Sequence, residues 1–146
     1  MCGGAKYTDN NGKEWKIYFP NPKAALPVVK NNSNVEWIKW GKRREELAPG
    51  FIQGGWARLN SIREGKWARF NPKPIQLAVT SFMEKDEERT SHWIEVPGDM
   101  AIQGLLATVN DEVRLYIVTE DTPSEYAWVH DRWPRLVSRL YENESL

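Results

Sequence analysis

Short segments with the composition of β-strands follow one another along most of this 146-residue chain. Each is rich in β-branched and aromatic residues or alternates apolar with polar positions, and Gly, Pro, Asn or charged residues separate them. The predicted strands cover residues 15–19, 35–40, 75–82, 92–96, 101–109 and 112–119. No internal repeat interrupts the series. The pattern favours an α+β domain dominated by a curved antiparallel sheet or incomplete barrel, with a few short helices.

The connections between these segments carry signals of their own. Residues 21–26 contain Pro22 and lie between two further prolines, which predicts an extended loop. The charged residues 85–89 predict a hairpin turn or a surface loop. Residues 122–125 read Thr-Pro-Ser-Glu, the order of a capped helix start, so a short helix should lead into residues 126–130.

Length and composition limit the classes of protein to which the chain can belong. A chain of 146 residues fits one domain, here residues 1–146. A single cysteine, Cys2, excludes an internal disulfide and a zinc site with several thiolates, and His92 and His130 are too few for a histidine-rich metal centre. We therefore expect no metal and no cofactor. Without an apolar run of membrane-spanning length or an export leader, we expect a cytoplasmic monomer with no membrane partner.

Charge is unevenly distributed although the formal net charge is zero. Residues 36–73 hold nine Lys or Arg against four acids, a net charge of +5, together with four of the eight tryptophans. Basic side chains interleaved with aromatic rings are typical of grooves that bind single-stranded nucleic acid. Two alternatives remain open: most tryptophans belong to the core, and the charged run 42–46 is a solvated loop or helix end.

Cys2 offers chemistry that depends on its position next to Met1. Loss of Met1 would expose an α-amine and a thiol on one residue, with ordinary pKa values of about 7.7–8.0 and about 8.5. The pair can condense with an aldehyde to an imine and close a five-membered thiazolidine. Alternatively, the thiolate can attack an acyl group with the α-amine as its base. The structural alternative is an ordinary thiol on a flexible end.

A series of motifs along the chain resembles the SRAP family, the SOS-response-associated peptidases, which are also described as abasic-site processing or hydroxymethylcytosine-binding proteins. The resemblance covers nearly the whole chain in shortened form, and its two ends are the most specific parts. The motifs are, in order, Met1-Cys2-Gly3, Pro27-Val28-Val29, Trp40-Gly41, Asn60 with Glu64, Phe82-Met83-Glu84, Gly104-Leu105, Thr119 and His130-Asp131-Arg132-Trp133-Pro134.

The resemblance implies covalent protection of damaged DNA. In the family, removal of the initiator methionine exposes a cysteine that traps the aldehyde of an abasic site in single-stranded DNA as a thiazolidine crosslink. The implied partners are single-stranded DNA with abasic sites and replication-fork DNA, in a nucleoid-associated, bacterial or phage setting. Met1 would be removed either by the chain itself, as a self-processing peptidase, or by an aminopeptidase. The matching catalytic residues are Cys2, Asn60, Glu84 and His130.

The chemistry of three of these residues can be argued independently. Opening the closed abasic sugar and forming the imine both require proton transfer, which suits Glu84 and His130. Asn60 offers an amide for orienting the N-terminus or the sugar. Each has a structural alternative: a surface glutamate, a histidine at a helix end, and a turn or capping asparagine.

The implied DNA contacts include positions at which the chain departs from the family. The family's arginine two residues after the asparagine is Ile62 here, so Arg58 or Arg63 would take its place, while Gly4 and Lys85 stand where arginine and tryptophan are usual. Arg132 would hold a phosphate or brace Asp131. Trp40 would stack on a base, with a buried core tryptophan as the alternative. The predicted DNA-binding residues are Trp40, Arg58, Arg63, Thr119, Arg132 and Pro22.

Two other classes of function compete with this interpretation. Met-Cys-Gly also begins the N-terminal-nucleophile glutamine amidotransferases, in which the cysteine attacks an amide, but that similarity ends after the first few residues. A module that binds single-stranded DNA without reacting is the third hypothesis. Replacing Cys2 with alanine separates it from the crosslinking hypothesis, because only the crosslink requires the thiol.

Overall fold

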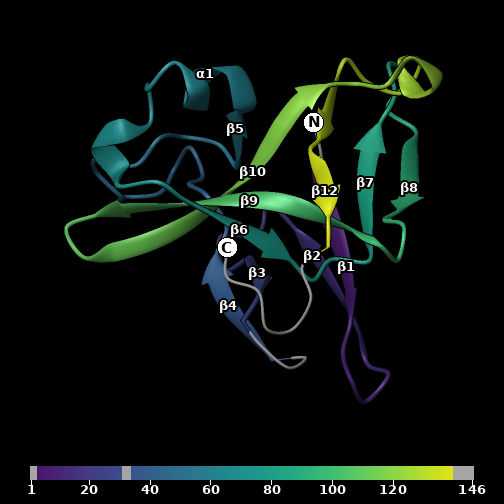
Figure 1. Cartoon of the computed structure of the whole chain (residues 1–146), viewed down its shortest axis with the longest axis horizontal. Coiled ribbons are helices and arrows are strands. Elements are labelled where there is room, and N and C mark those ends of the chain that lie inside the picture. The colour runs from purple at the N-terminus through teal and green to yellow at the C-terminus, as the bar shows by residue number, and fades with distance from the viewer. Residues whose placement is uncertain (1–2, 31–33, 140–146) are drawn as a thin grey trace.

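Two antiparallel sheets share one core in the computed structural model of the chain, which describes residues 3–30 and 34–139 (Figure 1). The smaller sheet has four strands in the order β2-β1-β7-β8. The first strand of the chain, β1, lies between β2 and β7, so the described chain begins inside this sheet. The four strands are β1 (Gly4–Thr8), β2 (Glu14–Tyr18), β7 (Ser81–Lys85) and β8 (Ser91–Glu95).

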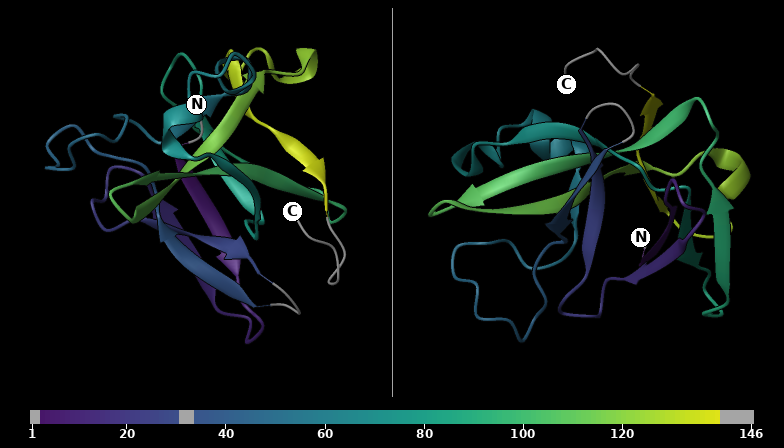
Figure 2. Two further views of the ribbon diagram at one scale, coloured as in Figure 1. Left: turned by 60° about the vertical axis from the view of Figure 1, so that its left-hand side comes forward. Right: turned by 90° about the horizontal axis from the view of Figure 1, so that it is seen from below.

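The larger sheet has eight strands, six of them in the order β11-β10-β9-β6-β3-β4, with β12 added on β9 and β5 on β10. All its pairs are antiparallel except β5 with β10. Neither sheet closes into a barrel (Figure 2). The strands of the larger sheet are β3 (Ala25–Val29), β4 (Val35–Lys39), β5 (Trp56–Arg58), β6 (Lys73–Leu77), β9 (Met100–Val109), β10 (Glu112–Asp121), β11 (Arg132–Pro134) and β12 (Leu136–Ser138).

The core lies between the inner faces of the two sheets. Ala5 and Phe82 face inward from the four-stranded sheet and are completely buried. Ile102, Leu115 and other buried residues of the eight-stranded sheet belong to the same cluster. Successive residues of a strand point to opposite faces, so on β7 one face supplies this core and the other is left for a site. The long strands β9 and β10 are buried on both faces, because their alternate residues pack in a second cluster with Trp67 and Phe70.

Helices are short in the described part of the chain: α1 (Leu59–Arg63) and the 3₁₀ turns η1 (Ala68–Phe70) and η2 (Ser124–Tyr126). The domain is compact and mostly β-sheet, with less helix than the expected α+β class implies. The capped helix expected at residues 122–125 is wrong, because Pro123 precedes a single 3₁₀ turn without a side-chain cap. Within residues 3–30 and 34–139, no helix is long and apolar enough to span a membrane.

Five of the six predicted strands are confirmed as β2, β4, β8, β9 and β10, with small shifts at their ends. The sixth, residues 75–82, is wrong, because it joins the end of β6 to the start of β7, which belong to different sheets. The end of β6 and the start of β7 both supply apolar residues to the core. The apolar pattern therefore continues from one sheet to the other and gives no sign of the break between the strands. The turn at 85–89 is confirmed between β7 and β8, and the loop expected at 21–26 ends where β3 begins at Ala25.

A tight corner after β4 explains the Trp40-Gly41 pair. Gly41 has a φ of +54°, and a side chain there would collide with the carbonyl of Gly54. A Cβ on Gly55 would lie 2.6 Å from Nε1 of Trp40, whose N–H donates to the carbonyl oxygen of Gly55 at 2.9 Å. Gly55 immediately precedes β5, so its contact with this corner fixes the start of β5, which forms one wall of the site described below.

Candidate functional site

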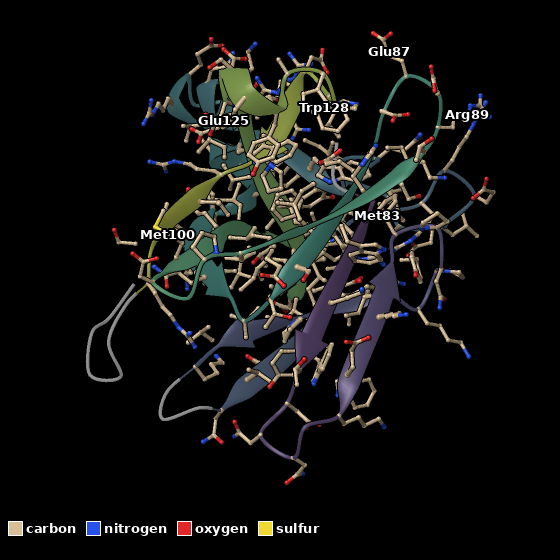
Figure 3. The ribbon with its side chains drawn as sticks, turned by 90° about the vertical axis from the view of Figure 1, so that its right-hand side faces the viewer. Met83, Glu87, Arg89, Met100, Glu125 and Trp128 are labelled. Carbon is tan, nitrogen blue, oxygen red and sulfur yellow. The ribbon has the colours of Figure 1, made fainter. Side chains whose placement is uncertain are left out.

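A cleft of about 1040 Å³ opens where the start of the described chain meets the tips of β7 and β8. Residues 127–131, after η2, pass over this end of the four-stranded sheet (Figure 1). Figure 3 shows Trp128 above Met83 and near the turn that carries Glu87 and Arg89. The lining consists of Gly3, Tyr18, Phe19, Pro20, Trp56, Met83, Lys85, Asp86, Glu87, Ser91, Trp93, Ala127, Trp128, Val129, His130 and Asp131.

Gly3 is fixed in this cleft by the sheet on both sides. Its N–H donates to the carbonyl oxygen of Met83, and its own carbonyl accepts from the N–H of Phe19, both at 3.1 Å. Gly3 thus extends β1 by one residue between β2 and β7. Cys2, the predicted nucleophile, lies outside the described residues.

Glu84 lies on the inner face of β7, completely buried. The lining of the cleft includes its two neighbours Met83 and Lys85, which point to the other face. Because Gly4 pairs with Met83, Gly3 stands opposite Glu84 in the register of the two strands. The pKa of Glu84 is raised to about 7, mainly because burial disfavours the charged carboxylate. The negative charge of Asp131 contributes to this rise.

His130 lies in the cleft lining with about a third of its side chain exposed. Its Nδ1 lies 3.1 Å from the N–H of Arg132 and 3.0 Å from Oδ1 of Asp131. A neutral ring accepts from Arg132 at Nδ1 and carries its proton on Nε2, whereas a protonated ring donates from Nδ1 to Asp131. Partial burial lowers the pKa of His130 and Asp131 opposes that shift, so the neutral form is favoured near neutral pH.

The structure does not bring Asn60 into the lining of the cleft. Asn60 is exposed on α1, and the exposed Arg58 and Arg63 lie on β5 and on the same helix. β5 pairs with the end of β10, where Arg58 stands opposite Thr119. Trp56 at the start of β5 lines the cleft, so these three residues lie beyond that wall.

Three of the predicted DNA-binding residues make contacts within the fold. Trp40 is completely buried, so no ring face is open to a base: the stacking prediction is wrong and the core alternative is confirmed. Thr119 is 1% exposed, and its hydroxyl and carbonyl oxygens accept from Nη2 of Arg132 at 3.2 and 3.0 Å. Arg132 also donates to Asp121 at 2.9 Å. Arg132 therefore braces Thr119 and Asp121, whereas the brace considered from the sequence was on Asp131; its phosphate contact stays a prediction.

The basic stretch 36–73 is partly neutralised inside the fold. Glu46 accepts from Nζ of Lys39 at 2.8 Å and from Arg114 at 2.6 Å, and it lies 3.8 Å from the buried Arg43. Burial alone would raise the pKa of Glu46, but hydrogen bonds from these groups and the positive charge of Arg114 lower it to about 2. Lys39 and Arg43 thus belong to a structural cluster. Pro22 is exposed on the loop before β3, whereas the neighbouring Pro20 lines the cleft.

Sequence reasoning missed most of the aromatic lining. Trp56, Trp93 and Trp128 all border the cleft, and none was predicted as a site residue. His92 was also missed: its Nε2 lies 2.7 Å from Oδ2 of Asp86, and its ring packs against Trp128. The available signal was strand alternation. Ile94 pairs with the inward-facing Phe82, so its neighbour Trp93 points to the opposite face, which lines the cleft.

Among the described residues, no group of three or more His, Cys, Asp or Glu side chains could hold a metal ion. No protein-family model matches the chain, and no curated protein matches it.

Proposed function

We propose that this chain is an abasic-site processing protein of the SRAP type. After loss of Met1, Cys2 traps the aldehyde of an abasic site in single-stranded DNA as a thiazolidine, and the crosslink protects the lesion. The observation that carries the proposal is the buried Glu84, with a pKa of about 7, opposite the Gly3 that begins the cleft.

Chain connectivity supports the participation of Cys2. Gly3 is fixed in the lining, and consecutive Cα atoms lie about 3.8 Å apart, so the amine and thiol of Cys2 begin one residue from the cleft. Hydrolysis of the Met1–Cys2 peptide bond consumes one water and frees that amine.

The trapping reaction consists of two bond-forming steps. The α-amine adds to the aldehyde carbon and the resulting carbinolamine loses water, which leaves an imine. The thiol sulfur then adds to the imine carbon while its proton passes to the nitrogen, and the five-membered ring closes. One water is released in total, and neither an oxidant nor a reductant is required.

Glu84 and His130 suit the proton transfers of this sequence. A carboxyl with a pKa of about 7 is close to half-protonated at neutral pH, so it can take a proton from the attacking amine and return it to the departing hydroxyl. The neutral ring of His130 holds a proton on Nε2 that it can donate to the ring oxygen of the closed sugar. The tryptophans of the lining suit unpaired bases, which stack on aromatic rings irrespective of sequence.

The proposal is tested by incubating the full chain with single-stranded DNA that carries one abasic site, followed by a denaturing gel. Wild type should give a heat-stable shifted band, and Cys2→Ala should give none. Glu84→Gln should slow the reaction by about 100-fold or more, the usual effect of losing a general acid or base. Glu87→Gln is the matched control, because Glu87 is an exposed glutamate of the same cleft. No band from protein that mass spectrometry shows to lack Met1 would contradict the proposal.

A further inference from the structure

Trp128 presents an unusually open ring at the cleft. Its exposed fraction is 63%, the highest of any tryptophan in the described part of the chain. It lines the cleft two residues before His130. Burial is the ordinary use of so large an apolar side chain, so an exposed tryptophan at a site requires another explanation.

The ring is fixed although it is exposed. Its indole N–H donates to the carbonyl oxygen of Glu125 at 3.1 Å, one turn earlier in the chain. The ring of His92 meets it nearly at a right angle, with centroids 5.0 Å apart and an interplanar angle of 83°. Two contacts on different elements therefore set the orientation of the indole.

The support behind Trp128 is fixed in turn. Nε2 of His92 lies 2.7 Å from Oδ2 of Asp86. Oδ1 of Asp86 accepts from the backbone N–H groups of Glu88 and Thr90, both at 2.9 Å. The β7–β8 turn thus holds Asp86, Asp86 holds His92, and His92 holds the ring of Trp128.

A ring held in this way selects its ligand by shape. Its only hydrogen-bonding group is already occupied by Glu125, so the exposed surface is flat and apolar. Such a surface binds another flat ring by stacking and reads no hydrogen-bonding edge. Any of the four nucleobases fits this description. Because Trp128 lies close to His130, a base stacked on its ring would be a neighbour of the reacting sugar.

We propose that Trp128 is the stacking platform for the nucleobase adjacent to the abasic site, held in place by the Asp86–His92 pair. This inference rests on the proposed function. It gives Trp128 a positioning role: the ring holds the neighbouring nucleotide so that the baseless sugar is presented to the cleft.

The test combines protein variants with altered DNA. Trp128→Ala should slow crosslinking by about tenfold on an abasic site flanked by ordinary bases, because the stacking contact with the neighbouring base is lost. Trp128→Phe should retain most of the rate. On DNA in which tetrahydrofuran residues replace both neighbouring nucleotides, Trp128→Ala and wild type should react equally slowly. An equal slowing by Trp128→Ala on both DNAs would overturn the inference.

Two controls separate a lost platform from a damaged site. Trp37→Ala removes another exposed tryptophan, on β4, and should leave the rate unchanged. Trapping of free deoxyribose 5-phosphate, which has no neighbouring base, should be the same in Trp128→Ala as in wild type. A loss of that activity would assign Trp128 to the chemistry or the fold and contradict the platform.

Binding of undamaged single-stranded DNA separates this inference from the proposed function. If no crosslink forms but Trp128→Ala weakens binding of a labelled oligonucleotide about tenfold, stacking stands and the covalent proposal fails. If the crosslink forms at the same rate in Trp128→Ala and wild type, the stacking inference fails alone. If the oligonucleotide neither binds nor reacts, both fail.

Discussion

The fold buries the carboxyl of Glu84 in an environment that disfavours its ionised form. Its pKa is about 7 in the folded chain against an ordinary value of 4.5. Between these two values the unfolded carboxyl is ionised while the folded one holds its proton, so the free energy of unfolding falls as the pH rises. The shift corresponds to about 3 kcal/mol above pH 7, at 1.36 kcal/mol per pKa unit. Retention of such a group in a core is typical of functional sites.

Replacement of this carboxyl should therefore stabilise the protein. Glu84→Gln should raise the free energy of unfolding by about 1–3 kcal/mol at about pH 8, and by much less at about pH 5, where wild-type Glu84 is protonated. Urea unfolding of both proteins at the two pH values measures the difference. Glu87→Gln should show no such dependence. The same gain in Glu84→Gln at both pH values would rule out the raised pKa as its cause.

The burial of Glu84 could have been predicted from strand periodicity, whereas its raised pKa could not. The surface alternative for Glu84 is wrong, because residues 82 and 84 share the inner face of β7. The predicted strand ended at residue 82, so the period was not carried as far as Glu84. Continued over two more residues, it would have placed the carboxyl on the buried face. The raised pKa itself depends on contacts from distant segments, which periodicity does not reveal.

At the scale of elements, the corner between β4 and β5 fixes the Trp56 wall of the cleft. Gly55→Ala should lower the free energy of unfolding by about 1–3 kcal/mol, because the new Cβ would meet the rings of Trp40 and Phe19. Thermal melting should fall by roughly 2–12 °C for a chain of this size. Gly98→Ala is the matched control, since nothing lies within 4 Å of its added Cβ. Equal melting temperatures for the two variants would contradict this account of the corner.

The loop after this corner is held by the cluster around Glu46. Its pKa of about 2 lies below the ordinary 4.5, so its contribution to stability is present above pH 4.5 and is lost as the pH falls towards 2. Glu46→Gln should lower the free energy of unfolding at neutral pH by about 2–4 kcal/mol, since Arg114 is buried beside it. Chemical denaturation measures this loss. Equal destabilisation at about pH 2 and about pH 7 would mean that the charge is not responsible.

Element prediction succeeded where one face was apolar and turns were marked. β8, β9 and β10 follow that description, and the turn at Asp86 was signalled by its charged run. β1 and β5 were missed, since Gly4 opens the first and the second has only three residues, Trp56–Arg58. β3 was missed as well, because Pro27 lies within it and proline usually argues against a strand.

At the scale of the whole molecule, the cleft depends on segments that are far apart in sequence. Gly3, Trp56, Met83 and Trp128 line it, and they come from β1, β5, β7 and the segment after η2 or their immediate neighbours. The family resemblance selected His130, which lines the cleft, and Glu84, which is buried between the lining residues Met83 and Lys85, but also Asn60, which lies outside the lining. Sequence motifs identify residue types in order, whereas the assembly of the lining requires the pairing of both sheets.

The identity of the residue that bonds to DNA is the most direct test of the covalent proposal. After reaction of the full chain with an abasic oligonucleotide, intact mass spectrometry and digestion should find one adduct, on Cys2. Its mass should equal that of the protein without Met1 plus the oligonucleotide less one water, and borohydride should leave it unchanged because a thiazolidine has no imine to reduce. An adduct on a lysine that forms only with borohydride, or an identical adduct in Cys2→Ala, would contradict the account.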